Sequence, residues 1–285
     1  MKNIENIKFW YNYFNETISD VAPSMKTSIK SIDDITGGIQ KRNLYCIAGR
    51  VGMGCKHLLL QWIVDLSLNH NCLYISNKYP HNILIPHMDV YLKSMKNTSE
   101  QDVLSKDMLS LKLDYGYRTK YYLEDLLEEI KDKHAVNPFD ILFLDDIQDI
   151  YMHNAPRYRD GELKKICIEL KDLAMQLNIA LIFTGKLIRS SDYRTYRKPS
   201  PIDIKESGAI ESVSDVILVL NRPYYYDPEA TDEDGCSLKN ILLVSIYHSE
   251  FMEDIRLTTV FEENKIIDEV KAEELYNSFY EETPF

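Results

Sequence analysis

The sequence predicts an α/β fold with a mostly parallel central sheet, helices on both faces and an antiparallel edge. From Leu44 onward, short apolar runs of strand length alternate with helical patterns, and strands separated by helices pair in parallel through right-handed crossovers. The last two predicted strands are instead joined by the polar loop YDPEATDEDGCS, which favours an antiparallel edge. With 285 residues and 45% hydrophobic composition, the chain can bury one sizeable core.

The N-terminal part of the domain alternates between strand and helix. LYCIA at 44–48 is short and wholly apolar, as expected of a buried parallel strand. A glycine turn then opens a helix predicted at 56–69, whose pattern is apolar over most of its length. CLYIS at 72–76 is a second buried strand, and a weaker helical pattern follows over 81–106.

The same alternation continues to the end of the domain. The helix predicted at 119–133 carries carboxylates toward its start and lysines toward its end, which complements the helix dipole. The strand DILFLDD at 140–146 ends in two aspartates, and a helix at 161–178 leads into the strand IALIFTG at 179–185. The last predicted strands are 216–220 and 240–247.

Two short segments flank the main domain, which we expect to span residues 23–268. Residues 1–22 contain an amphipathic helix whose apolar face either folds back on its own domain or docks on a neighbouring subunit, and the sequence leaves both alternatives open. The C-terminal tail, 269–285, has the pattern of a short amphipathic helix. The chain has neither a signal-peptide pattern nor an apolar run of membrane-spanning length, so we expect a soluble, cytoplasmic protein without membrane contact.

Charge and cysteine content exclude several functional classes. A net charge of −12 argues against a surface that binds nucleic acid all over, although a local basic strip remains compatible with it. The five cysteines are widely spaced and form no CxxC or Cys/His cluster, which argues against zinc and against a disulfide framework. Most should be buried reduced thiols, but Cys55 lies at a helix N-terminus, where we expect a lowered pKa.

The segment GRVGMGCKH has the glycine spacing of a phosphate-binding loop. A strand, a glycine turn and a helix N-terminus direct backbone N–H groups and the helix dipole at an anion. Such a loop next needs a lysine for the β and γ phosphates and a Ser or Thr for Mg²⁺, but Cys55 and Lys56 stand there. One residue rotates a helix by about 100°, so Lys56 cannot simply replace a lysine at position 55. The predicted nucleotide-binding residues are Gly49, Gly52, Gly54, Cys55, Lys56 and His57.

The strand at 140–146 supplies the candidate metal ligand. Asp145 stands where a P-loop ATPase keeps the carboxylate that holds Mg²⁺, downstream of a glycine loop. The alternative is that Asp145 and Asp146 are solvated charges at a strand end.

Several segments together resemble one family. TSIKSIDDITGGIQKRNLYCIAGRVGMG, FDILFLDDIQDI and RYRDGELKKICIELKDLAMQLNIALIFTGKLIR resemble, in this order, parts of the C-terminal RecA-like motor domain of DnaB-type replicative DNA helicases. RKPSPIDIKESGAIESVSDVILVLNRPYYY is the most specific match. The resemblance covers roughly residues 24–261 and implies a RecA-like P-loop NTPase fold that uses ATP and Mg²⁺. It also implies that residues 3–18 correspond to a linker helix that packs on the adjacent subunit of a ring.

The resemblance fails at the catalytic positions, so the ATPase motifs are degenerate. The family's phosphate lysine falls on Cys55 and its Mg²⁺-binding hydroxyl on Lys56. The glutamate that activates water falls near Lys78, and the polar sensor glutamine falls on Lys186. The Lys-x-Arg pair supplied to the neighbouring subunit's γ-phosphate falls on the positions of Ile246 and His248. Since an ammonium group cannot accept a proton from water at pH 7, these substitutions argue against efficient ATP hydrolysis, while the loop amides leave nucleotide binding open.

Two loops correspond to those that hold single-stranded DNA in the family's central channel, HNAPRYR at 153–159 and RSSDYRTYRKP at 189–199. Basic residues interleaved with tyrosines suit a phosphate backbone with stacked bases. The alternative is a solvated loop whose charge only aids solubility. The predicted DNA-binding residues are Arg157, Arg159, Arg189, Arg194, Arg197 and Lys198.

Three functions follow from these observations. The first is a DnaB-like homologue in DNA replication or recombination that hydrolyses ATP poorly or not at all and serves as a DNA-binding or regulatory subunit. It would assemble with itself, as a ring or smaller oligomer, or with a replicative helicase. The second is an active ATP-dependent helicase or translocase in which Lys56 reaches the phosphate. The third is a protein-interaction module that binds neither nucleotide nor DNA.

Overall fold

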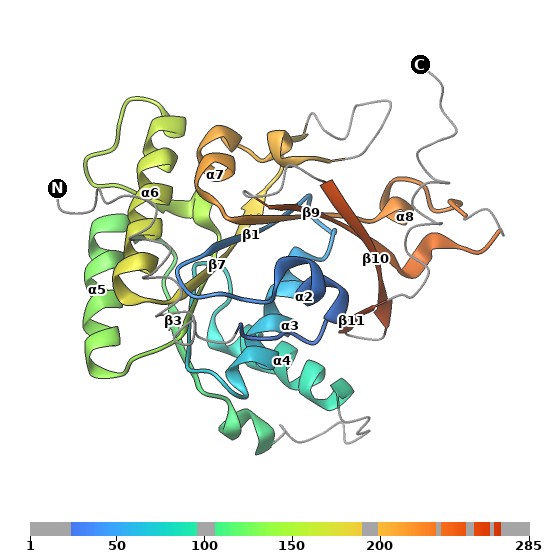
Figure 1. Cartoon of the computed structure of the whole chain (residues 1–285), viewed down its shortest axis with the longest axis horizontal. Helices are drawn as coiled ribbons and strands as arrows, with labels where there is room; N and C mark the ends of the chain where they lie inside the picture. Colours follow the sequence, from blue (N-terminus) through green and yellow to red (C-terminus); the bar gives the residue numbers. More distant parts are fainter. Residues whose placement is uncertain are drawn as a thin grey trace, which may run out of the picture.

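A nine-stranded sheet organises the chain in our computed structural model, which describes residues 24–95, 106–189, 199–231, 235–248, 254–262 and 265–268 (Figure 1). The strand order is β11-β10-β9-β8-β1-β7-β5-β2-β3. The strands are β1 (Leu44–Gly49), β2 (Cys72–Ser76), β3 (Leu113–Tyr117), β5 (Ile141–Asp145), β7 (Ala180–Lys186), β8 (Val216–Asn221), β9 (Ile241–His248), β10 (Asp254–Glu262) and β11 (Lys265–Asp268).

Strand directions confirm the predicted sheet. From β3 to β8 every neighbouring pair is parallel, because each connection returns through a helix or a long loop to the same end of the sheet. The pairs β8–β9, β9–β10 and β10–β11 are antiparallel and form the predicted edge.

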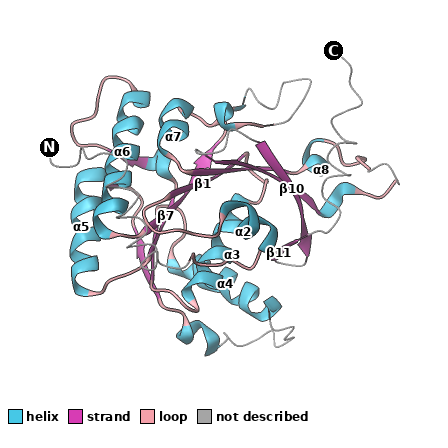
Figure 2. Cartoon of the chain, viewed as in Figure 1, coloured by secondary structure: helices cyan, strands magenta, loops and turns pink. Residues whose placement is uncertain are grey.

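Helices cover both faces of the sheet (Figures 1 and 2). One face carries α2 (Lys30–Thr36), α3 (Cys55–Ser67) and α4 (His81–Met95), and the other carries α5 (Leu123–Val136), α6 (Arg159–Leu177) and α7 (Ser207–Val213). Shorter elements are α8 (Pro223–Tyr226) and the 3₁₀ turns Lys106–Ser110, Ile147–Asp149, Pro201–Asp203 and Leu238–Asn240.

The central strand β1 divides the core in two. Tyr45 and Ile47 belong to the cluster packed under α2, α3 and α4, whereas Leu44, Cys46 and Ala48 belong to the cluster under α5 and α6. Successive strand residues point to opposite faces, so a strand covered on both sides must be apolar throughout. This requirement explains why LYCIA lacks the polar alternation of a half-exposed strand.

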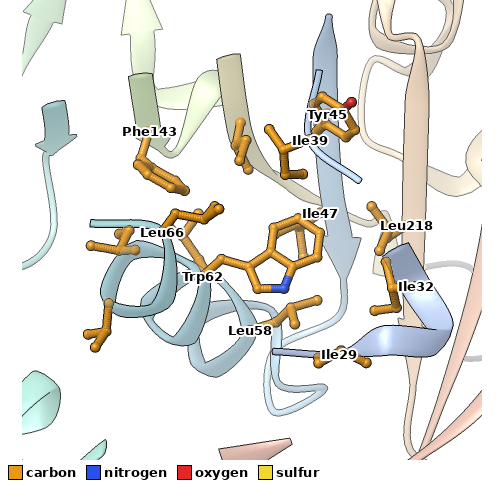
Figure 3. Packing of buried hydrophobic residues seen from close by; sticks show 14 of the residues in the cluster. Ile29, Ile32, Ile39, Tyr45, Ile47, Leu58, Trp62, Leu66, Phe143 and Leu218 are labelled. Atoms are coloured by element: carbon orange, nitrogen blue, oxygen red, sulfur yellow. The ribbon is translucent and has the colours of Figure 1, made fainter. Parts of the chain in front are cut away.

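Trp62 anchors α3 to the sheet. Its indole is fully buried and lies among Ile47, Leu58, Leu218 and Ile32 (Figure 3). Burying a side chain of this size contributes roughly 2–3 kcal/mol of hydrophobic free energy. The packing holds the N-terminus of α3 at the carboxyl end of β1, where the glycine turn lies.

Some elements differ from the sequence-based prediction. The edge strand β3 was missed because LDYGY carries an aspartate and a glycine and is only half-buried. The helix expected from residue 119 begins at Leu123, because Tyr121 and Tyr122 form the short strand β4 (Tyr121–Tyr122), which pairs with β6 (Ile150–Tyr151). The helix pattern over 81–106 forms α4 only as far as Met95, and residues 96–105 lie outside the described part of the chain.

The flanking segments remain predictions. The amphipathic helix within residues 1–22 lies outside the described residues, as does the tail at 269–285. Within the described residues, no helix combines the length and the apolar character needed to cross a membrane.

Gln61 of α3 ties the helix to the edge strand β11. Its side-chain amide donates to the carbonyl of Ile266 and its oxygen accepts from the Ile266 N–H, both at 2.8 Å. The amide also donates to the Ser28 hydroxyl at 2.7 Å. Gln61 is buried, so one side chain satisfies both backbone polar groups of an edge residue that has no further strand beside it.

We expect Gln61→Ala to lower the free energy of unfolding by about 2–4 kcal/mol, because it leaves the buried N–H and C=O of Ile266 without partners. Urea denaturation followed by circular dichroism measures the change. Gln176→Ala on the exposed side of α6 is the matched control and should change stability by less than about 0.5 kcal/mol. Equal effects of the two substitutions would contradict the role given to Gln61.

Candidate functional site

The glycine loop between β1 and α3 has the backbone of an anion-binding turn. Gly52 and Gly54 adopt positive φ angles of 90° and 97°, a region that side-chain-bearing residues rarely occupy. A Cβ atom on Gly49 would lie 2.5 Å from the Cys55 Sγ atom, so the close approach of strand and helix also requires glycine there. Since α3 starts at Cys55, the loop opens on the N-terminus of a 13-residue helix.

A cavity of about 660 Å³ lies in front of this loop. It is bounded by the loop, by the residues at the carboxyl ends of β2, β5 and β7, and by α4. All six predicted nucleotide-binding residues line it. Its wall on the α4 side is apolar and contains Leu60, Leu84 and Val90, with the ring of Tyr91.

Positive charge dominates the cavity lining. Among its described lining residues are the side chains of five lysines and arginines and of only two acids. The basic residues are Arg50, Lys56, Lys78, Lys186 and Arg222, and the acids are Asp145 and Asp146. In a chain with a net charge of −12, a cavity with this excess of cations attracts an anionic ligand.

Asp145 and Asp146 form the floor of the cavity at the end of β5. The Thr184 hydroxyl lies 2.6 Å from Asp145 Oδ1 and 2.8 Å from Asp146 Oδ1. Both aspartates are buried. The alternative interpretation of these residues as solvated strand-end charges is therefore wrong, because β5 lies in the interior of the sheet and its end is covered.

The two lysines at the degenerate positions converge on this floor. Lys78 Nζ forms an ion pair with Asp146 Oδ2 and lies 3.5 Å from Asp149 Oδ2. Lys186 Nζ lies 3.1 Å from Asp146 Oδ2 and 2.8 Å from Asp149 Oδ2. Burial lowers the pKa of Lys78 to about 8, although the charge of Asp145 opposes the change. Burial raises the pKa of Asp149, but its bond to Lys186 and the charges of both lysines outweigh this and hold it below its usual value.

Asp149 and Gln148 are site residues that the sequence-based prediction did not select. Gln148 accepts from the Lys186 N–H at 2.8 Å and donates to the Lys186 and Lys205 carbonyls at 3.3 and 3.2 Å. It thereby holds the end of β7 in place. The motif DDIQD was visible in the sequence, but its pairing with two distant lysines depends on the strand order.

Magnesium does not fit the oxygen atoms at this floor. Mg²⁺ prefers six oxygen ligands in octahedral geometry, usually carboxylates and water. Asp146 Oδ2 already accepts from both lysines, and the remaining hydroxyl-ligand position is Lys56. Asp145 Oδ2 is the one oxygen of the two aspartates that lacks a hydrogen-bond partner among the described residues. The predicted role of Asp145 as a Mg²⁺ ligand therefore loses its supporting ligands.

Lys56 lies against an aromatic ring. Its ammonium group is 4.3 Å from the centroid of Tyr79, the residue that follows Lys78. This cation–π contact directs the side chain toward the β2–α4 connection. The orientation does not favour the alternative in which Lys56 takes over the phosphate contact of a lysine at position 55.

Cys55 has the opposite acidity from the one predicted. Burial, together with the negative charge of Asp145, raises the pKa of its thiol to about 12. The helix N-terminus favours the thiolate, but the loss of hydration outweighs this effect. Cys46, Cys72 and Cys167 are buried free thiols as expected, whereas Cys236 is exposed.

The structure separates the remaining predicted residues. Ile246 is buried within β9 and cannot reach a neighbouring subunit, while His248 is the last residue of that strand. Arg157 and Arg189 are exposed. The predicted residues Arg194, Arg197 and Lys198 lie outside the described part of the chain.

Arg159 has a structural role, contrary to its predicted role as an exposed DNA contact. Its guanidinium donates to the carbonyls of Gln148 and Ile150 at 2.8 and 2.7 Å and pairs with Glu162. An arginine with these internal bonds stabilises the connection between β5 and α6. It is therefore a poor candidate for a phosphate contact.

The comparison with known protein families is decisive for this fold and loop. The family of DnaB-like helicase C-terminal domains matches residues 24–247. The chain belongs to this family. It is 26% identical over 245 residues to a probable plasmid replicative DNA helicase of Chlamydia psittaci, which covers 80% of this chain and 53% of the relative. It is 28% identical over 229 residues to the replicative DNA helicase DnaB of Helicobacter pylori, with coverages of 75% and 46%. The chain thus spans about half the length of these relatives.

Solved structures confirm the RecA-like fold of this DnaB-like chain. A DnaB-like replicative helicase, solved in a study of its interactions with primase, superposes with a TM-score of 0.76 at 21% identity, covering 93% of this chain and 67% of that protein. An ATPase domain solved on its own gives the same TM-score of 0.76 at 20% identity, covering 94% of this chain and all of that domain.

We expect Cys55 to resist alkylation. With a pKa of about 12, its thiol is ionised to roughly one part in ten thousand at pH 8, and the thiolate is the reactive form. Iodoacetamide labelling at pH 8, quantified by peptide mass spectrometry, should modify the exposed Cys236 first. Cys236 is the internal control, and labelling of Cys55 at an equal rate would show that the thiol is not shielded.

Proposed function

We propose that this DnaB-like chain acts in DNA replication or recombination as a subunit that binds a nucleotide at the glycine loop without hydrolysing it efficiently. The observation that carries the proposal is the position of Lys78. Its ammonium group lies at the cavity floor, paired with Asp146, in the place that the family resemblance gives to the water-activating glutamate. The cavity can therefore hold an anion but lacks the base that would activate water.

Nucleotide binding is supported by the shape and charge of the cavity. The loop glycines open the helix N-terminus toward it, and its basic side chains outnumber its acids. Its α4 side adds an apolar wall next to the charged floor. A polyphosphate joined to an aromatic base combines the same two kinds of surface.

Slow hydrolysis is supported from both sides of the site. Within the chain, Cys55 replaces the lysine that would contact the β and γ phosphates, and its thiol is neutral. On the side that would face a neighbouring subunit, buried Ile246 occupies one position of the Lys-x-Arg pair. Losing such cationic groups costs several orders of magnitude in turnover.

A role with DNA and with other subunits rests on family membership. The relatives are described as replicative and plasmid replicative helicases. On this basis the chain contacts single-stranded DNA through Arg157, Arg189 and the basic residues 194–198. It assembles with itself, as a ring or smaller oligomer, or with an active replicative helicase.

We expect ATP turnover, with or without single-stranded DNA, at no more than about one-thousandth of the rate of an active DnaB-type helicase, because neither a general base nor the phosphate lysine is present. A coupled phosphate-release assay measures it, with an active DnaB-type helicase as the positive control. DNA-stimulated turnover that Lys56→Ala abolishes would contradict the proposal and support an active motor with a rearranged loop.

We expect replacement of Arg157, Arg189, Arg194, Arg197 and Lys198 by glutamine to weaken single-stranded DNA binding. The slope of log affinity against log salt should fall by about 3, because five phosphate contacts on a single strand release about 0.7 counterion each. Fluorescence anisotropy with a labelled oligonucleotide measures both quantities. Lys131→Gln on exposed α5 is the control, and an unchanged salt slope in the five-fold variant would remove these loops from the account.

A further inference from the structure

We infer that the site takes its polyphosphate ligand free of magnesium, with the ammonium groups of Lys78 and Lys186 supplying positive charge that a metal supplies in a working P-loop ATPase. This inference rests on the proposed nucleotide binding and specifies its ligand as a metal-free nucleotide. Three features carry it: the strand order, the use of the carboxylate oxygens, and the charge of the cavity.

The strand order brings both lysines to the aspartates. In the sheet, β5 lies between β2 and β7, and all three strands are parallel. Lys78 follows β2, Lys186 ends β7, and Asp146 follows β5. The carboxyl ends of adjacent parallel strands meet at one edge, so each lysine reaches the aspartates from the opposite side.

The backbone holds each lysine at this point. The Lys78 N–H donates to Ser76 Oγ at 3.1 Å, and Ser76 is fully buried at the end of β2. The Lys186 backbone bonds to Gln148 through both its N–H and its carbonyl. Neither side chain can therefore withdraw from the floor without breaking local backbone bonds or leaving Asp146 unpaired.

The carboxylate oxygens are already in use. Asp146 Oδ2 lies next to both ammonium groups, and Asp149 Oδ2 lies within 3.5 Å of both. A divalent cation would have to displace these groups and would then lie beside two like charges. The arrangement therefore disfavours the metal by competition for ligands and by repulsion.

The ligand should then prefer the site in its more highly charged form. Chelation by Mg²⁺ removes two negative charges from a nucleoside di- or triphosphate. The cavity lining has more lysines and arginines than acids, so the metal-free anion is attracted more strongly than its magnesium complex. Arg50 and Arg222 add to the positive lining at the loop end of the cavity.

Equilibrium binding of a fluorescent ADP analogue, in EDTA and in excess MgCl₂, tests the ligand form. We expect the unmodified chain to bind at least as tightly in EDTA as with magnesium. The double variant Lys78→Gln, Lys186→Gln should lose about tenfold in affinity in EDTA. Lys205→Gln, an exposed neighbour of Lys186 outside the cavity lining, is the matched control and should behave as the unmodified chain.

Electron paramagnetic resonance of Mn²⁺ alone, without nucleotide, tests the exclusion of the metal separately. We expect no stoichiometric Mn²⁺ binding by the unmodified chain and a gain of one site in the double variant, where the carboxylates lose their ammonium partners. If the double variant does not fold by circular dichroism, Lys186→Gln alone replaces it, since the Lys186 side chain is 43% exposed against 25% for Lys78.

The two arms distinguish the possible failures. Nucleotide binding about tenfold tighter with magnesium, or a tight Mn²⁺ site in the unmodified chain, would overturn the inference and leave the proposed nucleotide binding intact. Absence of nucleotide binding in both buffers would overturn the proposed function, and with it the claim of a metal-free ligand. The Mn²⁺ arm would then still decide whether the lysines exclude a metal.

Discussion

The position of β5 between β2 and β7 is the constraint on which the site depends. Parallel strands end at the same edge of a sheet, so the residues after these three strands must share one small volume. In this chain that volume receives Asp145 and Asp146 from the middle strand and a lysine from each neighbour. The same arrangement in a working motor would bring a metal ligand, a base and a sensor together, so substitutions on the two outer strands change the chemistry without changing the fold.

The scaffold and the chemistry of the site therefore vary independently. Glycines with positive φ, the helix N-terminus and the buried anchor Trp62 maintain the loop geometry. None of these features depends on a base or on a phosphate lysine. A chain can thus keep the anion-binding shape of a motor domain after its hydrolytic groups have been replaced, provided that the new side chains satisfy the buried carboxylates.

Much of the fold was predictable because its strands are covered on both faces. Strands such as 44–48 and 72–76 are continuously apolar, and their lengths and helical connections predict a parallel sheet. The prediction failed where burial is partial. The half-buried strand β3 has mixed composition, and the pairing of β4 with β6 involves only two residues on each side. The positions of Cys55, Lys78 and Lys186 were predictable from the motifs, whereas Asp149 and Gln148 were not selected, since their roles come from contacts with distant residues.

The sequence alone determined the fold class, the family and the loss of the catalytic residue types, because these depend on local pattern and on the order of motifs. Tertiary structure decided what the replacements do. The pKa of Cys55 is raised because burial outweighs the helix N-terminus, and Arg159 bonds internally because two backbone carbonyls lie within its reach. Lys78 and Lys186 pair with the same two aspartates because β5 separates their strands by one position on each side. Hydration and distance are properties of the folded chain, and sequence spacing does not contain them.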